Sequence, residues 1–239
     1  VSRAATFNTS SQSASVKTYI VRESLVYDPR TDVWSSIGAN TDVSATAAGA
    51  RGSTNGTTGL AALGSGGSIV AVRSDASILF DAVDDKTASY TVETLVLPET
   101  PDFVSVTASA NGSISTAWST SASLRVYKSR ALNAASDTAD ADWTAEGTSL
   151  SEDGSQGVAI TYAEAAPVIA YAASSHDPVI HLRYWNDVDW IPFAQLGSDI
   201  LSGQPGYNPV ITADISRVCV AYSEVAASTT KTRVICFGK

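Results

Sequence analysis

The chain has 239 residues, of which 44% are apolar and 16% are charged, so it holds enough apolar side chains to build a sizeable core. It carries 15 Lys and Arg against 24 Asp and Glu, and the resulting net charge of -9 repels phosphate backbones, which excludes nucleic acid as an expected partner. No apolar run reaches the roughly 18 residues that a membrane-spanning helix needs.

The first segment, residues 1–38, contains short β-type runs around a long Ser-rich loop. It matches the later half of the units described below, so we expect the chain to begin part-way through a structural unit. One of its predicted strands carries Arg22, Glu23 comes next, and Trp34 lies in an Asp-x-Trp sequence. Residues 39–58 form the longest low-complexity stretch, which predicts a flexible surface connection.

Four further units follow, and each alternates apolar with polar residues in runs separated by Gly, Ser, Asn and Asp. One of them reads as four strands in succession, and its first two strands are marked by Val158 and Val168. Nearly the same offset between the first two strands recurs in every unit. The four units cover residues 59–97, 102–147, 157–197 and 208–239.

Four-stranded units with a partial unit at each end predict an all-β fold, a single-domain β-propeller over residues 1–239. We expect five four-stranded blades, closed by exchange of the N-terminal and C-terminal strands. Closure also removes the sheet edges that a linear array would leave open to aggregation. Six short blades remain an alternative blade count, and a two-sheet β-sandwich is the alternative fold.

The two cysteines, Cys219 and Cys236, flank a polar turn near Ala227, which would place them opposite one another on paired strands. We expect a disulfide that locks this hairpin, with two buried free thiols as the alternative. The sequence starts at Val1 and contains no methionine, which favours a processed, secreted product. Three N-x-S/T sequons add the expectation of a glycoprotein. They begin at Asn8, Asn55 and Asn111.

Tryptophans that closely follow an aspartate recur at matching places in three units, and the strand before each carries an arginine. A tryptophan ring stacks on the C–H face of a sugar, and a guanidinium donates paired hydrogen bonds to hydroxyls. Repeated sites would add avidity. The competing interpretation is that each tryptophan fills the wedge between adjacent sheets. The residues concerned are Trp34, Trp143 and Trp190, with Arg22, Arg125 and Arg183 before them and Arg233 at the matching place in the last unit.

The stretch from His181 to Gly197 contains a second tryptophan, Trp185, without a tryptophan at the same place in the other units. Tyr127 is its nearest aromatic relative in unit 102–147. Trp190 shares its position with other units and is therefore first a residue that builds the sheet. We expect Trp185, together with Arg183, to be the part of this stretch that touches a ligand.

Two segments, residues 21–38 and residues 114–130 followed by a tryptophan, resemble the repeats of fungal fucose-specific lectin propellers. Those repeats pair an Arg-x-Tyr strand with a Glu and a Trp-x-x-Gly segment. The resemblance covers two units and is degenerate elsewhere. It implies the following roles: Arg125 as the sugar-binding arginine, Arg22 or Glu23 as its polar partner, and Trp34 and Trp143 as the stacking wall.

These observations predict a secreted lectin that binds glycans or glycoproteins between its blades and is not an enzyme. We expect no cofactor and no metal site, because the aspartates near Asp187 are explained by turn capping, with calcium as the alternative. An oligomer is compatible with this reading. The alternatives are a propeller glycosidase or lyase, which needs carboxylates or a His and a Tyr in one cleft, and a protein-binding or structural propeller. The predicted sugar-binding residues are Arg22, Glu23, Trp34, Arg125, Tyr127, Trp143, Arg183, Trp185 and Trp190.

Overall fold

The computed structural model contains only β-strands among the residues that it describes, and no helix occurs there. The predicted all-β class is therefore confirmed. Side chains are described for most of these residues from 94 onward and for fewer before it. The described residues are 2–7, 17–22, 25–28, 30–36, 41–42, 58–62, 67–74, 76–84, 90–120, 122–129, 143–150, 155–173, 178–193, 200–201, 204–226 and 228–238.

Four antiparallel sheets follow the four predicted units, and in each sheet neighbouring strands are consecutive in sequence. The first sheet consists of β6 (Thr58–Ala62), β7 (Gly67–Ser74), β8 (Ser77–Asp84) and β9 (Tyr90–Val96). The second consists of β10 (Phe103–Ala108), β11 (Ile114–Ser119), β12 (Leu124–Ser129) and β13 (Trp143–Ala145). The third consists of β14 (Ser155–Ala163), β15 (Ala166–Ala173), β16 (Val179–Trp185) and β17 (Trp190–Pro192). The last has three strands, β18 (Gly206–Ala213), β19 (Arg217–Ala226) and β20 (Thr229–Gly238).

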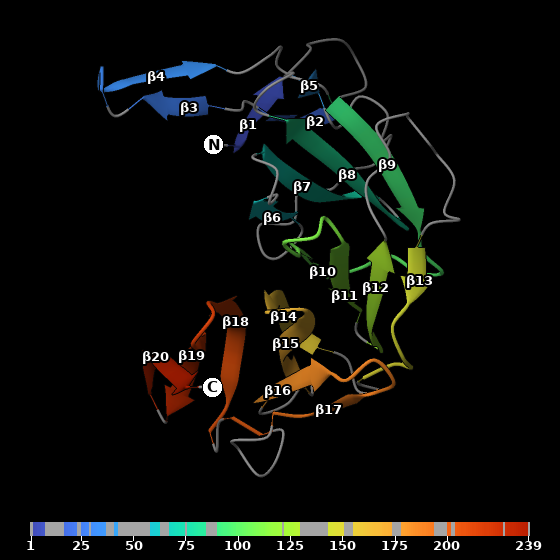
Figure 1. Ribbon diagram of the computed structural model, residues 1–239, viewed down its shortest axis with the longest axis vertical. Coiled ribbons are helices and arrows are strands. Elements are labelled where there is room, and N and C mark those ends of the chain that lie inside the picture. Colours follow the sequence, from blue (N-terminus) through green and yellow to red (C-terminus); the bar gives the residue numbers. More distant parts are fainter. Residues whose placement is uncertain are drawn as a thin grey trace.

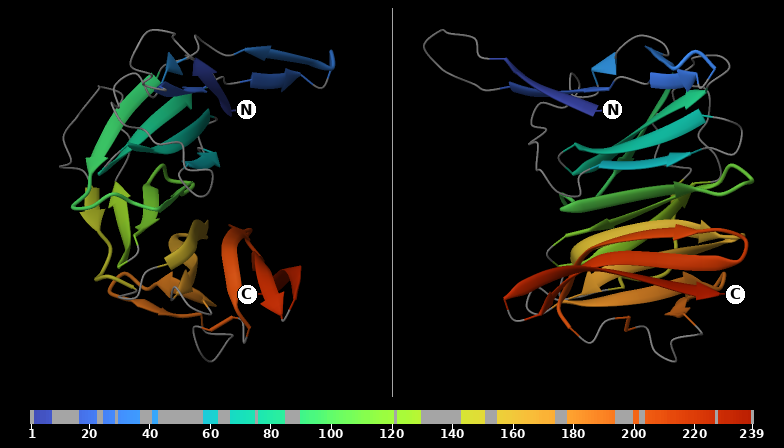
Figure 2. Two further views of the ribbon diagram at one scale, coloured as in Figure 1. Left: turned by 180° about the vertical axis from the view of Figure 1, so that it is seen from behind. Right: turned by 90° about the vertical axis from the view of Figure 1, so that its left-hand side faces the viewer.

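The sheets succeed one another along an arc, with their first strands on its inside (Figures 1 and 2). Strand β10 contacts both β6 and β14, and β14 contacts β18. This is the arrangement of blades in a propeller, in which the innermost strands surround a common axis. The predicted propeller fold is supported by this arrangement, while the number of blades stays a prediction.

Each pair of neighbouring sheets buries a core between them, so there are three such cores in the described part of the chain. In the two middle sheets, the second strand is covered on both faces by the neighbouring sheets. All six residues of β11 are buried, as are the six central residues of β15. This explains why these strands combine small and apolar residues and lack the strict alternation of a strand with one face in water.

The N-terminal strands differ from the prediction. Strands β1 (Ser2–Phe7), β2 (Lys17–Arg22) and β5 (Thr41–Asp42) form one sheet, and β3 (Leu25–Asp28) pairs with β4 (Val33–Ser36) in another. Within the described residues β1 pairs with β2, and β20 pairs only with β19. The predicted exchange of terminal strands is therefore not made by these residues, and the two ends lie at opposite ends of the arc (Figure 1).

The predicted disulfide between Cys219 and Cys236 is confirmed. The two residues face one another across β19 and β20, with Cα atoms 4.0 Å apart. A disulfide is compatible with the predicted secretion, which itself stays a prediction.

Removing this disulfide should lower stability, because it closes a loop with a sequence separation of 17 residues. Loop-closure entropy gives about 3 kcal/mol for a loop of this size. We expect the double variant Cys219→Ser, Cys236→Ser to unfold at a lower urea concentration than the oxidised wild type. Reductant should shift the wild type in the same direction and leave the double variant unchanged; equal midpoints for both proteins would contradict the prediction.

Candidate functional site

Trp143 and Trp190, predicted to stack on sugars, are core residues. Trp143 is 7% exposed and stacks on Phe80 of the preceding sheet, with ring centroids 4.5 Å apart. Trp190 is 3% exposed and lies in the core between β10–β13 and β14–β17. Neither side chain presents a free ring face, so the sugar-contact prediction is corrected for both: they fill the wedge between sheets.

The glycine that follows Trp143 has a structural role in the next wedge. Gly147 has a φ of +77°, which favours glycine, and a Cβ there would lie 3.1 Å from Trp185 Cζ3 and 3.2 Å from Trp190 Cδ1. The two tryptophan rings are 5.5 Å apart between centroids. Trp190 also donates its Nε1 hydrogen to the carbonyl oxygen of Glu146 at 2.8 Å. The Trp-x-x-x-Gly pattern therefore docks one sheet on the next.

The predicted residues Arg125, Tyr127, Arg183 and Trp185 are all partly exposed. Tyr127 packs against the core between β6–β9 and β10–β13, and Trp185 packs against the following core. The two arginines therefore belong to different interfaces, as the predicted set of several sites between blades requires, and their contact with sugar stays a prediction. Arg22 and Trp34 are described by their backbone alone, and Glu23 lies outside the described residues.

Polar side chains meet between β10–β13 and β14–β17, close to the Trp185 and Trp190 pair. Ser115 on β11 and Tyr162 on β14 share a hydrogen bond of 2.8 Å between their hydroxyls. On the same interface, Lys128 Nζ of β12 lies 3.8 Å from Oε1 of Glu146, which follows β13. We call Ser115, Lys128, Glu146 and Tyr162 the inter-sheet polar cluster.

Glu146 is the most unusual member of the inter-sheet polar cluster. Its side chain is only 7% exposed, and within the described part of the chain its Oε2 has no hydrogen-bond partner. Burial raises the pKa of this carboxyl, nearby Lys128 lowers it, and the charge of Asp187 raises it. Burial likewise raises the pKa of the Tyr162 phenol, an effect that its hydrogen bond to Ser115 opposes. Glu146 is thus placed to hold a proton at higher pH than an exposed glutamate.

Asp187 lies at the rim of this interface, in the exposed turn between β16 and β17, with a φ of 71°. Asn186 shapes the turn, because its Oδ1 accepts the backbone N–H groups of Val188 and Asp189. The side chain of Asp189 accepts the N–H of Trp190 at 2.8 Å. Turn capping accounts for Asn186 and Asp189, whereas the Asp187 carboxylate takes no part in these hydrogen bonds.

A depression of about 170 Å³ lies beside the disulfide, lined by Thr212, Ala213, Asp214, Arg217 and Cys219. The carboxylate of Asp214 already has partners, because it accepts two hydrogen bonds from Ser216 and forms an ion pair with Arg217 at 3.1 Å. These bonds hold the pKa of Asp214 well below its usual range. The depression is a weaker candidate for a ligand site than the inter-sheet polar cluster, because its charged side chains are bonded to one another and to the backbone of the turn between β18 and β19.

Among the described residues, no group of three His, Cys, Asp or Glu side chains is arranged to hold a metal ion. In the same part of the chain, no helix is long and apolar enough to cross a membrane.

No protein-family model matches this sequence, and no curated protein sequence matches it. Among solved structures, the chain is similar to the Trypanosoma rangeli sialidase, with a TM-score of 0.55 and 9% sequence identity. This match covers 93% of the chain but only 39% of the sialidase chain. A mutant of the Cellvibrio cellulosa alpha-L-arabinanase gives a TM-score of 0.42 at 10% identity, over 77% of this chain and 70% of the arabinanase chain.

The likeness to the sialidase shows the fold, a β-propeller, and leaves the expected kinship with fucose-specific lectins unsupported. It also corrects one expectation. We expected a protein without catalytic activity, yet the sialidase that shares this fold is a glycosidase, so that expectation is not kept.

Glu146 was missed as a site residue in the sequence, where glutamates are spread one or two to a unit. The available signal was its place directly before Gly147, at the end of a strand that opens with a buried tryptophan. That spacing turns the glutamate toward the next sheet, where burial and neighbouring charges set its chemistry.

Proposed function

We propose that the chain is a secreted β-propeller glycosidase that binds glycans at the inter-sheet polar cluster and uses Glu146 as its proton donor. The observation that carries this proposal is the Glu146 carboxyl group, which is only 7% exposed, has an unpartnered Oε2 in the described part of the chain, and is influenced by the charge of the exposed Asp187 of the next sheet. The likeness to a sialidase supports glycosides as the first substrate class to test.

Hydrolysis of a glycoside commonly needs two carboxyl groups with different protonation states. One protonates the leaving oxygen, and the other stabilises positive charge on the sugar or activates the incoming nucleophile. Glu146 suits the first role because burial raises its pKa. Asp187 suits the second role because it is exposed to water, and its charge acts on Glu146.

The remaining residues of the interface suit substrate positioning. Trp185 is partly exposed and packs on Trp190, so it offers an aromatic surface that is held in place. Lys128 is 36% exposed and can donate hydrogen bonds to hydroxyls at the rim. In this proposal Trp190 supports the site from the core and does not contact the sugar.

Incubation of the purified chain with a library of sialosides and neutral oligosaccharides, followed by mass spectrometry, tests the proposal. We expect at least one glycoside to be cleaved with incorporation of one oxygen from labelled water. Binding of a glycan without any cleavage, at protein concentrations that saturate it, would contradict a glycosidase and leave a binding protein.

A further inference from the structure

A second interface, between β6–β9 and β10–β13, contains buried hydrogen-bond donors without acceptors. Trp118 on β11 is fully buried, and Arg125 stands directly opposite it on β12. Within the described residues, neither Trp118 Nε1 nor Arg125 Nε has a hydrogen-bond partner. A buried N–H group without an acceptor is costly, more so when it belongs to a charged group.

The last sheet contains a similar pair, in which a carboxylate faces the arginine. There Tyr222 on β19 stands opposite Arg233 on β20, as Trp118 stands opposite Arg125. Arg233 donates both Nε and Nη2 to Oε1 of Glu224, at 3.1 and 3.0 Å. Glu224 is nearly buried, with 9% of its side chain exposed. In the last sheet, the carboxylate that pairs with the arginine therefore comes from the sheet itself.

The second sheet lacks that carboxylate. Glu224 comes two residues after Tyr222, and the residue at the same distance from Trp118 is Thr120. The Thr120 hydroxyl is engaged in its own turn, where it accepts the N–H groups of Ala122 and Ser123 at 3.1 Å. Glu99, the acid beside this turn, accepts a hydrogen bond from Ser123 at 2.7 Å. Neither residue faces Arg125 as Glu224 faces Arg233.

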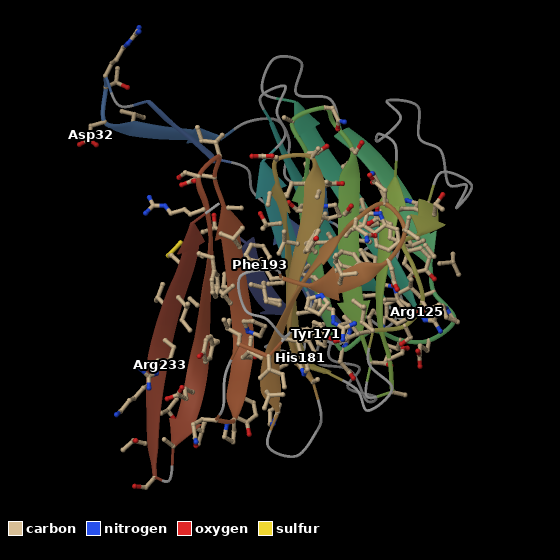
Figure 3. The ribbon with its side chains drawn as sticks, turned by 60° about the horizontal axis from the view of Figure 1, so that its bottom comes forward. Asp32, Arg125, Tyr171, His181, Phe193 and Arg233 are labelled. Carbon is tan, nitrogen blue, oxygen red and sulfur yellow. A yellow bond between two sulfur atoms is a disulfide. The ribbon has the colours of Figure 1, made fainter. Side chains whose placement is uncertain are left out.

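We propose that Arg125 and Trp118 form a binding site for a carboxylate carried by a ligand, in the place that Glu224 occupies in the last sheet. A carboxylate matches a guanidinium with two parallel hydrogen bonds and can also accept from an indole N–H. Arg125 is partly exposed, whereas its Nε and Trp118 Nε1 are buried, so a ligand carboxylate has to approach these two donors from the exposed side of Arg125. Figure 3 shows Arg125 and Arg233 on opposite sides of the molecule, so the two positions are separate.

This site lies at a different interface from Glu146 and does not rest on the proposed glycosidase. It also differs from the role implied by the lectin resemblance, since it selects a charged group instead of sugar hydroxyls. The carboxylate can come from an acidic sugar or from a peptide. The chain as a whole repels anions at its net charge of -9, so binding must come from this local arrangement.

Isothermal titration calorimetry with glucuronate, N-acetylglycine and glucose, at constant ionic strength, tests the site. We expect saturable binding of glucuronate and none of glucose. Equal binding of N-acetylglycine would show that the carboxylate alone is recognised, and weaker binding would assign the site to acidic sugars. Absence of binding of both carboxylates to the folded wild type would overturn the proposal.

Variants locate the binding. Arg125→Lys keeps the charge but loses the fork of donors, and we expect at least a tenfold loss of affinity; Arg125→Met should abolish binding. Thr120→Glu places a carboxylate in the second sheet at the position that corresponds to Glu224, and this carboxylate should block the site. Arg217→Met, an exposed arginine of another turn, is the matched control and should bind as the wild type does. Unchanged affinity in a folded Arg125→Met variant would refute the assignment, whether or not Thr120→Glu folds.

Discussion

Glu146→Gln is expected to lower kcat for glycoside cleavage by a factor of about 10² to 10⁴, the usual contribution of a general acid. The change replaces a carboxyl by an amide of the same shape, so the buried volume beside Trp190 is kept. The proton that the leaving oxygen needs is lost. The measurement is kcat and KM on the glycoside identified by the library, and we expect the loss to appear in kcat.

The pH profile of the wild type gives an independent readout. Glu146 must be protonated to act, so kcat should fall as pH rises through its pKa, which burial raises. In Glu146→Gln this alkaline limb should disappear from the residual activity. An unchanged limb in the variant would assign the proton donor to another residue.

Folding can be separated from catalysis in the same variant. The folded-state pKa of Glu146 is raised, so its contribution to stability is greatest below the pKa of the unfolded chain and is lost as pH rises through the folded pKa. At neutral pH the amide removes the cost of a buried charge, and Glu146→Gln should be at least as stable as the wild type. Glu164→Gln, an exposed glutamate in the turn between β14 and β15, is the matched control and should keep full activity.

The four sheets could be predicted from the sequence because their signal is local and repeated. Alternation marks each strand, turn residues separate the strands, and the constant offset between the first two strands shows the repeat. The disulfide was predictable for the same reason, since Cys219 and Cys236 lie at equal distances from one hairpin turn. The pairing of the N-terminal strands was harder to predict, because the sequence of residues 1–38 indicates strands but not which of them pair.

The candidate site could not be predicted, because its members meet only across two sheets. Ser115 and Tyr162 are far apart in sequence, and each is an ordinary strand residue when taken alone. The raised pKa of Glu146 depends on burial by the next sheet, which no local pattern encodes. The recurring tryptophans suggested repeated sugar sites. A residue that packs between neighbouring sheets recurs at the same place in each unit as well, so the recurrence alone does not distinguish the two roles.

Trp190→Ala is expected to destabilise the chain by about 3 to 5 kcal/mol, the usual cost of truncating a buried tryptophan. The side chain is 3% exposed and lies in the core between two sheets. Its loss leaves a cavity against Gly147 and removes the hydrogen bond from Nε1 to the Glu146 carbonyl. Urea unfolding followed by circular dichroism measures the difference in the free energy of unfolding.

Two further variants distinguish a core role for Trp190 from a ligand contact. Val188→Ala, in the same hairpin and at a side chain 80% exposed, should change stability by no more than about 0.5 kcal/mol. Trp185→Ala should cost less stability than Trp190→Ala because its ring is partly exposed, and it should weaken glycan binding directly. If Trp190→Ala kept wild-type stability and lost only glycan binding, the recurring tryptophan would be a ligand contact, and the wedge between sheets would be held by the other apolar residues of that core.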